Sequence, residues 1–140
     1  MRQEPLMLAL TLFVGLALGA LGYDALSAQQ VPPIEAKGIT AKALASLDLG
    51  REIQGLQGRY LRARLVTAEP GGRGAVHSHD DRPAIPYVLR GTLTQCTADG
   101  KCTELREGQA GAAGKGTVHW DENKGTTPLI YLVLDISQEP

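Results

Sequence analysis

From Arg59 onward, apolar and polar residues alternate with the two-residue period of a β-strand. In residues 59–70 the even and odd positions therefore form opposite faces, which are Tyr60, Arg62, Arg64 and Val66 on one side and Leu61, Ala63, Leu65 and Thr67 on the other. The same pattern predicts strands at 75–79, 102–108, 117–123 and 128–137, and a strand at 85–96 that bends or divides at Gly91. We expect residues 70–72 to end the first strand and residues 111–116 to form a glycine-rich turn.

Short strands with frequent turn signals and no helical period predict an all-β fold, either a sandwich or a barrel. The last strand, 128–137, is an almost continuous apolar run and is expected to be buried. Residues 29–58 are predicted to be a linker and N-terminal extension, because two prolines and many glycines exclude a long helix there. One short helical turn or one N-terminal strand is all that this segment predicts, so the barrel domain is expected at 59–137.

The first 28 residues differ in character from the rest of the chain. No charged residue occurs in 6–22, Arg2 precedes this stretch, and small and polar residues follow at 25–30. This order resembles a secretory signal peptide with cleavage after Ala28 or, alternatively, after Ser27. The stretch also nears the length of a membrane-spanning helix, so an uncleaved anchor in the inner membrane is the alternative. We expect a periplasmic or secreted protein whose only membrane contact, if the segment is retained, is through residues 6–22.

Length and charge narrow the class of protein further. The chain has 140 residues and a formal net charge of −1, and without residues 1–28 it holds equal numbers of basic and acidic residues. A nucleic-acid-binding protein normally carries a clustered basic surplus, so no nucleic-acid partner is expected. The length that remains suits one compact domain.

The two cysteines, Cys96 and Cys102, flank a segment that contains the turn dipeptide Asp99-Gly100. A hairpin centred there places the cysteines opposite each other at a Cα separation that a disulfide accepts. An oxidising compartment would allow the bond to form. Two unpaired thiols are the alternative, and the spacing fits neither a redox-active nor a metal-binding cysteine motif.

The three histidines are candidates for metal ligands. His77 and His79 are two residues apart, so both project from one face of a strand, and His119 lies on a later predicted strand. Imidazole is the commonest protein ligand for transition metals near neutral pH. Two exposed or hydrogen-bonded histidines are the alternative interpretation of an isolated His-x-His.

The spacing of histidines and glycines resembles the two signature motifs of the cupin superfamily. The first motif, G-x5-H-x-H-x3,4-E-x6-G, aligns with Gly71, His77, His79 and Gly91, and the second, G-x5-P-x-G-x2-H-x3-N, aligns with Gly108, Gly116, His119 and Asn123. The resemblance covers about residues 59–137. It implies a small antiparallel double-sheet barrel of the jelly-roll kind, one bound divalent transition metal ion, and association into a homodimer.

Two positions depart from the cupin pattern. Gly114 replaces the motif proline, and Pro83 or Ala84 stands where the motif has its glutamate. The predicted metal ligands are therefore His77, His79 and His119 alone, a set that suits Fe, Mn, Ni, Zn or Cu. Asp81 and Asp121 could replace the missing carboxylate, or they could be solvated loop charges.

Two further residues are candidates for substrate binding. Arg82 should lie at the barrel mouth and could hold a carboxylate, although a surface arginine is the plainer interpretation. Tyr87 could face either side of the sheet. The sequence thus predicts an exported single-domain cupin that acts on or binds a small molecule, either anionic or neutral, with no catalytic residue assigned. The alternatives are a non-catalytic small-molecule or metal-binding module of the cell envelope and a degenerate barrel kept for assembly.

Overall fold

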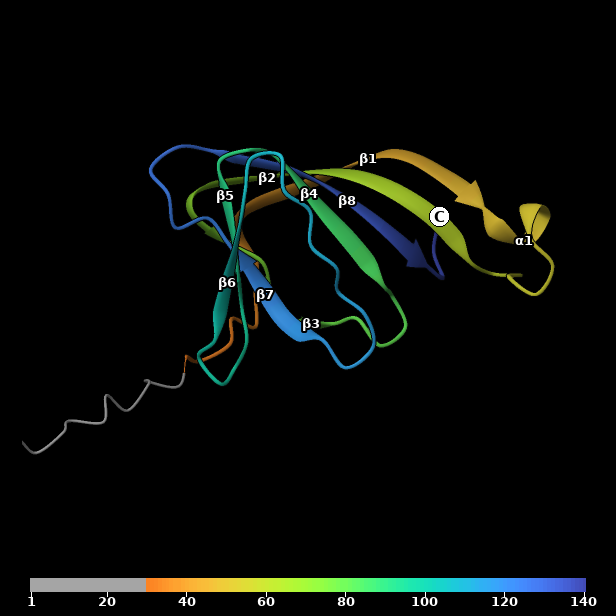
Figure 1. Ribbon diagram of the computed structural model, residues 1–140, viewed down its shortest axis with the longest axis horizontal. Helices are drawn as coiled ribbons and strands as arrows, with labels where there is room; N and C mark the ends of the chain where they lie inside the picture. The colour runs from red at the N-terminus through yellow and green to blue at the C-terminus, as the bar shows by residue number, and fades with distance from the viewer. Residues whose placement is uncertain (1–29) are drawn as a thin grey trace, which may run out of the picture.

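The computed structural model describes residues 30–140, which Figure 1 shows in colour. The predicted signal peptide or anchor at residues 1–28 lies outside the described residues. Within residues 30–140, no helix has both the length and the apolar character needed to cross a membrane.

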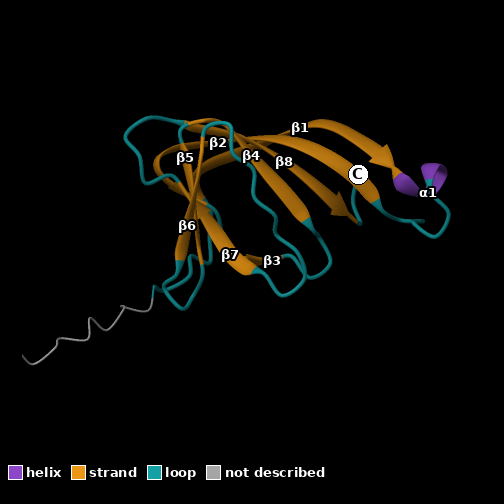
Figure 2. Cartoon of the chain, viewed as in Figure 1, coloured by secondary structure: helices purple, strands orange, loops and turns teal. Residues whose placement is uncertain are grey.

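The described chain is almost entirely β-structure, which confirms the predicted all-β fold (Figure 2). The strand that precedes the predicted barrel is followed by one turn of helix. The elements are β1 (Lys37–Asp48), α1 (Leu49–Glu52), β2 (Tyr60–Arg73), β3 (His77–Ser78), β4 (Ala84–Arg90), β5 (Thr92–Cys96), β6 (Cys102–Arg106), β7 (Val118–Glu122) and β8 (Leu129–Ser137).

The strands form a nearly closed antiparallel barrel of two layers. Strand order is β4-β8-β2-β7-β5-β6, with β1 added to β2 and β3 added to β7. In Figure 1, β1, β2, β4 and β8 form one layer, while β3, β5, β6 and β7 form the other. β2 pairs with β8 along Tyr60–Ala68 and then reaches β7 at Arg73, so this one strand joins both layers.

The prediction that residues 70–72 end the first strand is wrong, because β2 continues to Arg73. Gly71 adopts a positive φ of 75°, and its backbone N–H donates to the carbonyl of Asn123. The N–H of Asn123 in turn donates to the carbonyl of Gly72. The glycines therefore bend the strand from one layer to the other instead of terminating it.

The extension at 29–58 contains both of the elements that were considered for it. β1 pairs with β2 from Lys37 to Asp48, and α1 follows directly. The Asp48 side chain caps this short helix by accepting a hydrogen bond from the Gly50 N–H at 3.0 Å. β1 is exposed along nearly its whole length, with only Ile39 and Asp48 partly buried.

The core lies between the two layers and follows the predicted alternation. The inward-facing residues of β2, β4, β5 and β8 form one cluster, which consists of Val66, Ala68, Val88, Leu93, Leu129 and Tyr131. The expectation that 128–137 is buried along its length is wrong, because β8 alternates and Leu134 is 41% exposed. The outer face of this layer is open, so only one side of β8 contacts the core.

The hairpin β5–β6 contains the predicted disulfide. Cys96 and Cys102 are directly paired across the two strands, with their Cα atoms 4.2 Å apart, and their sulfurs are bonded. The turn includes Gly100, whose positive φ of 82° is the conformation expected after Asp99. Cys96 is fully buried, whereas Cys102 is exposed.

Removing this disulfide should lower the free energy of unfolding by about 2 kcal/mol, because the cross-link restricts only a short loop of the unfolded chain. The measurement is denaturant unfolding of the oxidised protein and of the Cys96→Ala/Cys102→Ala variant. Reductant should destabilise the first protein and leave the variant unchanged. Equal stability of the two oxidised proteins would contradict the expectation.

Candidate metal centre

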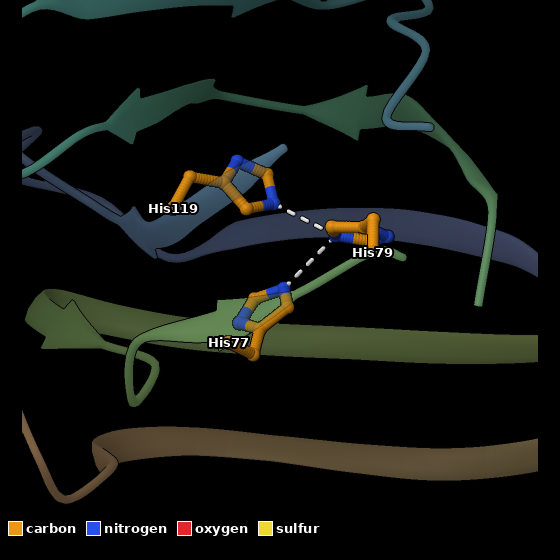
Figure 3. Close-up of side chains that lie close together, drawn as sticks. All are labelled: His77, His79 and His119. Atoms are coloured by element: carbon orange, nitrogen blue, oxygen red, sulfur yellow. Dashed lines mark hydrogen bonds between the residues drawn. The ribbon is translucent and has the colours of Figure 1, made fainter. Parts of the chain in front are cut away.

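β-Pairing brings the three histidines of the chain together. His77 in β3 lies directly opposite His119 in β7, and His79 follows β3 with its N–H bonded to the Thr117 carbonyl. Their side chains point to a common position between the strands (Figure 3). The structure thus places all three predicted ligands in one cluster, inside the barrel rather than on its surface.

The three rings are arranged with nearly threefold regularity. Ring centroids are 4.8–4.9 Å apart and ring planes are inclined by 60–67°. The Nε2 atom of His79 lies 3.1 Å from Nε2 of His77 and 2.9 Å from Nε2 of His119. Nitrogen ligands at about 2.1 Å from one ion are about 3.0–3.4 Å apart, so the two distances from His79 are close to those of ligands that share an ion. The ligand atoms of all three histidines lie within 4.8 Å of one another.

The hydrogen bonds at the far side of two rings strengthen this interpretation. Nδ1 of His77 is 3.0 Å from the Ala75 carbonyl oxygen, and Nδ1 of His79 is 2.8 Å from that of Arg82. A carbonyl oxygen only accepts, so each Nδ1–H donates and each neutral ring keeps a lone pair on Nε2. Two lone pairs facing each other at 3.1 Å repel unless a cation lies between them. The donor set therefore fits a divalent metal ion.

Burial keeps the rings in the form that binds metal. His79 and His119 are 4% and 5% exposed. Desolvation lowers the pKa of His119 to about 4, and the charge of His77 and other neighbours adds to the shift, while Asp121 opposes it. Burial also lowers the pKa of His79, with a smaller opposing effect from its bond to the Arg82 backbone. Neutral imidazole at physiological pH is the state that coordinates metal.

The metal-free protein should lose stability as the pH falls from about 6.5 to about 4. In this range an unfolded histidine binds a proton, whereas His119 in the folded state, with a pKa of about 4, does not. Acidification therefore favours the unfolded state, by roughly 2–3 kcal/mol over the range. Unfolding in a chelator at a series of pH values measures the effect. A His119→Gln variant should have a flatter profile, and an unchanged slope in that variant would contradict the assignment.

No carboxylate completes the ligand set among the described residues. Where the cupin motif has glutamate, Pro83 is exposed and the methyl group of Ala84 lines the cavity. Asp81 is exposed, and its backbone carbonyl accepts a hydrogen bond from Arg59. Asp121 lines the cavity, but its carboxylate accepts hydrogen bonds from Gln95 and Tyr131.

Asp121 belongs to a hydrogen-bonded group on the barrel wall. Its Oδ1 accepts from Gln95 Nε2 at 3.0 Å, and its Oδ2 accepts from Tyr131 Oη at 2.9 Å. Burial, reinforced by this carboxylate, raises the pKa of Tyr131 far above its ordinary value. The tyrosine therefore stays protonated and acts as a donor that orients Asp121.

The histidines open into a cavity of about 400 Å³ between the layers. Arg82, the other candidate for substrate binding, lines this cavity. The structure does not bring Tyr87 to it: the side chains of Ala84, Pro86 and Val88 point inward, so Tyr87 lies on the outer face and is 39% exposed.

Sequence reasoning missed the partners of Arg82. Arg64 also lines the cavity, and the buried Asp135 of β8 holds Arg62 and Arg64 through short ion pairs. Two signals were available: Arg62 and Arg64 share the face of Val66, and Asp135 is a lone charge in an apolar run. Alternation assigned the face, but it did not show that β2 and β8 are neighbours.

An antiparallel barrel with three clustered histidines, on β3, on β7 and just after β3, defines a cupin-type protein whose histidines could hold a metal ion. Residues 64–135 match the family model of the cupin domain, and the chain belongs to that family. A germin-like protein of Arabidopsis thaliana, subfamily 2 member 1, is 28% identical over 110 residues, which cover 74% of this chain and 50% of that protein. The chain therefore spans about half the length of this curated relative.

Solved structures agree on the fold. The polyketide cyclase RemF from Streptomyces resistomycificus superimposes with a TM-score of 0.59 at 22% identity, covering 79% of this chain and 73% of that one. A predicted oxalate decarboxylase from Thermotoga maritima gives a TM-score of 0.57 at 21% identity, covering 75% and 92%. Similarity at this level of sequence identity establishes the barrel fold alone.

Proposed function

We propose that this protein is an exported cupin that holds one divalent transition metal ion on His77, His79 and His119 and acts on a small molecule in the adjoining cavity. The convergence of the unprotonated Nε2 atoms carries the proposal. Fe, Mn, Ni, Zn and Cu all accept three imidazoles, so the ion is left to experiment.

The residues around the site have separable tasks. When bound, the ion would supply Lewis acidity and open coordination positions. The backbone carbonyls of Ala75 and Arg82 orient two of the ligands. Since no carboxylate joins the set, the charge of the ion stays uncompensated there, which favours an anionic ligand. The apolar lining, including Val66, Ala84 and Val133, limits the access of water.

Two observations support export. Residues 1–28 have the order of a signal peptide or anchor. The bonded pair Cys96–Cys102 is of the kind that persists in oxidising compartments and is rare in the cytosol. The proposed location is the periplasm or the exterior of the cell.

A non-catalytic binding module is the second candidate function. The observation in its favour is that Asp121, the carboxylate of the cavity wall, is already bound by Gln95 and Tyr131. A carboxylate so engaged is a weaker proton acceptor for a substrate. The structural neighbours named above include a cyclase and a predicted decarboxylase, and those names favour an enzyme.

Metal analysis tests the proposal. The full chain, produced without a histidine tag, should contain close to one equivalent of a transition metal. The His77→Ala/His119→Ala variant should contain none, and the control Asp81→Asn should keep it, because Asp81 lies away from the cluster. Absence of metal after reconstitution with each of the five ions would refute the metal site. If the bound metal is iron, the next assay is O₂ consumption, and if it is zinc, the next assays are hydrolysis and isomerisation. Turnover would separate an enzyme from a binding module.

A further inference from the structure

Three arginines surround one buried carboxylate beside the metal centre. Asp135 is 1% exposed, and its oxygens accept from Arg62 Nε and Nη2 at 3.0 and 3.2 Å and from Arg64 Nη2 at 2.7 Å. Arg82 Nε lies 3.9 Å from the same group. We call Arg62, Arg64 and Arg82 the arginine cluster. Its three positive charges face one negative charge.

The arrangement leaves donors of two arginines unused. Arg62 binds both oxygens of Asp135 and Arg64 binds one of them, whereas Arg82 stays beyond hydrogen-bonding distance at 3.9 Å. The buried Nε–H of Arg64 has no partner. A buried donor without an acceptor costs free energy, so the guanidinium group of Arg64 is only partly satisfied by Asp135.

Both arginines with unused donors face the histidine cavity. Arg64 and Arg82 line it together with His77, His79 and His119. Burial, together with the charge of Arg64, lowers the pKa of Arg82. Asp121 offsets only part of this charge, and the uncharged polar side chains of the lining, apart from the histidines, are Thr40, Gln95 and Tyr131.

We propose that Arg82 and Arg64 form a carboxylate subsite, so that the ligand of this cupin is a small carboxylic acid whose other end reaches the three-histidine centre. This inference rests on the proposed function. The planar fork of Arg82 matches the two oxygens of a carboxylate, and the positive charge of Arg64 at the same cavity favours an anion there. A phosphate has more oxygens than this fork pairs, and Gln95 and Tyr131 already donate to Asp121, so a carboxylate is the better match.

Calorimetric titration of the full chain, metal-free and metal-loaded, tests the subsite. The probes are malonate, its uncharged analogue malonamide, and inorganic phosphate. Malonate should bind and malonamide should not. Arg82→Gln should weaken malonate binding at least about tenfold, and Arg82→Lys should weaken it less, because lysine keeps the charge but loses the fork. Arg90→Gln, a change at an exposed arginine of β4, should have no effect.

The outcomes separate the subsite from the metal site. The metal content of Arg82→Gln should equal that of wild type, because the backbone carbonyl that holds His79 is kept. If the protein takes up no metal on reconstitution but binds malonate in a way that depends on Arg82, the subsite is upheld and the metal site is rejected. Metal binding with equal malonate affinity in wild type and Arg82→Gln would overturn the subsite. No response to malonate in either form, or stronger binding of phosphate, would also overturn it.

Discussion

Replacing Asp135 with asparagine is expected to lower the free energy of unfolding by about 3–5 kcal/mol, among the largest effects of any single substitution in this protein. Asp135 is the acceptor for two short ion pairs and lies near a third arginine. Without its charge, the arginine cluster stays largely buried and uncompensated. Denaturant unfolding at neutral pH measures the change.

Two further variants identify the cause. Asp99→Asn removes an ion pair with Lys101 in which both side chains are more than half exposed, so no measurable change is expected. Adding Arg64→Leu to Asp135→Asn should recover part of the lost stability, because it removes one of the unpaired charges. Wild-type stability in Asp135→Asn, or a further loss in the double variant, would show that charge pairing is not what stabilises this part of the barrel.

The second large effect is stabilisation by metal. A ligand that binds only the folded state at about 1,000 times its dissociation constant adds about 4 kcal/mol to the free energy of unfolding. The ligands come from β3, β7 and the segment after β3, so the ion would connect strands that otherwise share only a short pairing. Thermal unfolding in the reconstituting metal and in chelator measures the difference.

His119→Ala should abolish this metal-dependent difference. In chelator the variant should differ from wild type only by the packing of the lost ring, whereas in metal the two proteins should differ by several kcal/mol. Gln109→Ala, at an exposed residue far from the cluster, is the matched control and should respond to metal as wild type does. The same melting temperature of wild type with and without each ion would count against the centre.

Local signals in the sequence predicted most of the fold and the histidines. Alternation located the strands, Asp99-Gly100 located the hairpin, and motif spacing brought His119 to His77. The features that these local signals could not predict depend on which strands are neighbours and on bulges within strands. Gly71 bends a strand that glycine was expected to end, because its backbone groups find partners in β7.

The arginine cluster shows why part of the site remained hidden. Arg64 and Asp135 are 71 residues apart and meet only because β8 inserts between β2 and β4. Alternation specifies the face of each residue and leaves the order of strands open. For the same reason, alternation did not show which side of the sheet Tyr87 occupies. Its neighbours Pro86 and Val88 point inward, so Tyr87 faces outward.

The place of β8 between β2 and β4 also bears on when the chain can fold during synthesis. β8 is the last strand along the chain, yet it is central to its layer. Until Leu129–Ser137 has been synthesised, β4 lacks the strand with which it pairs, and β2 lacks its neighbour on one side. Until then Arg62 and Arg64 also lack Asp135 as an acceptor. Pairing over such long sequence separations is slow. The barrel of this protein therefore cannot close until its last strand has been made.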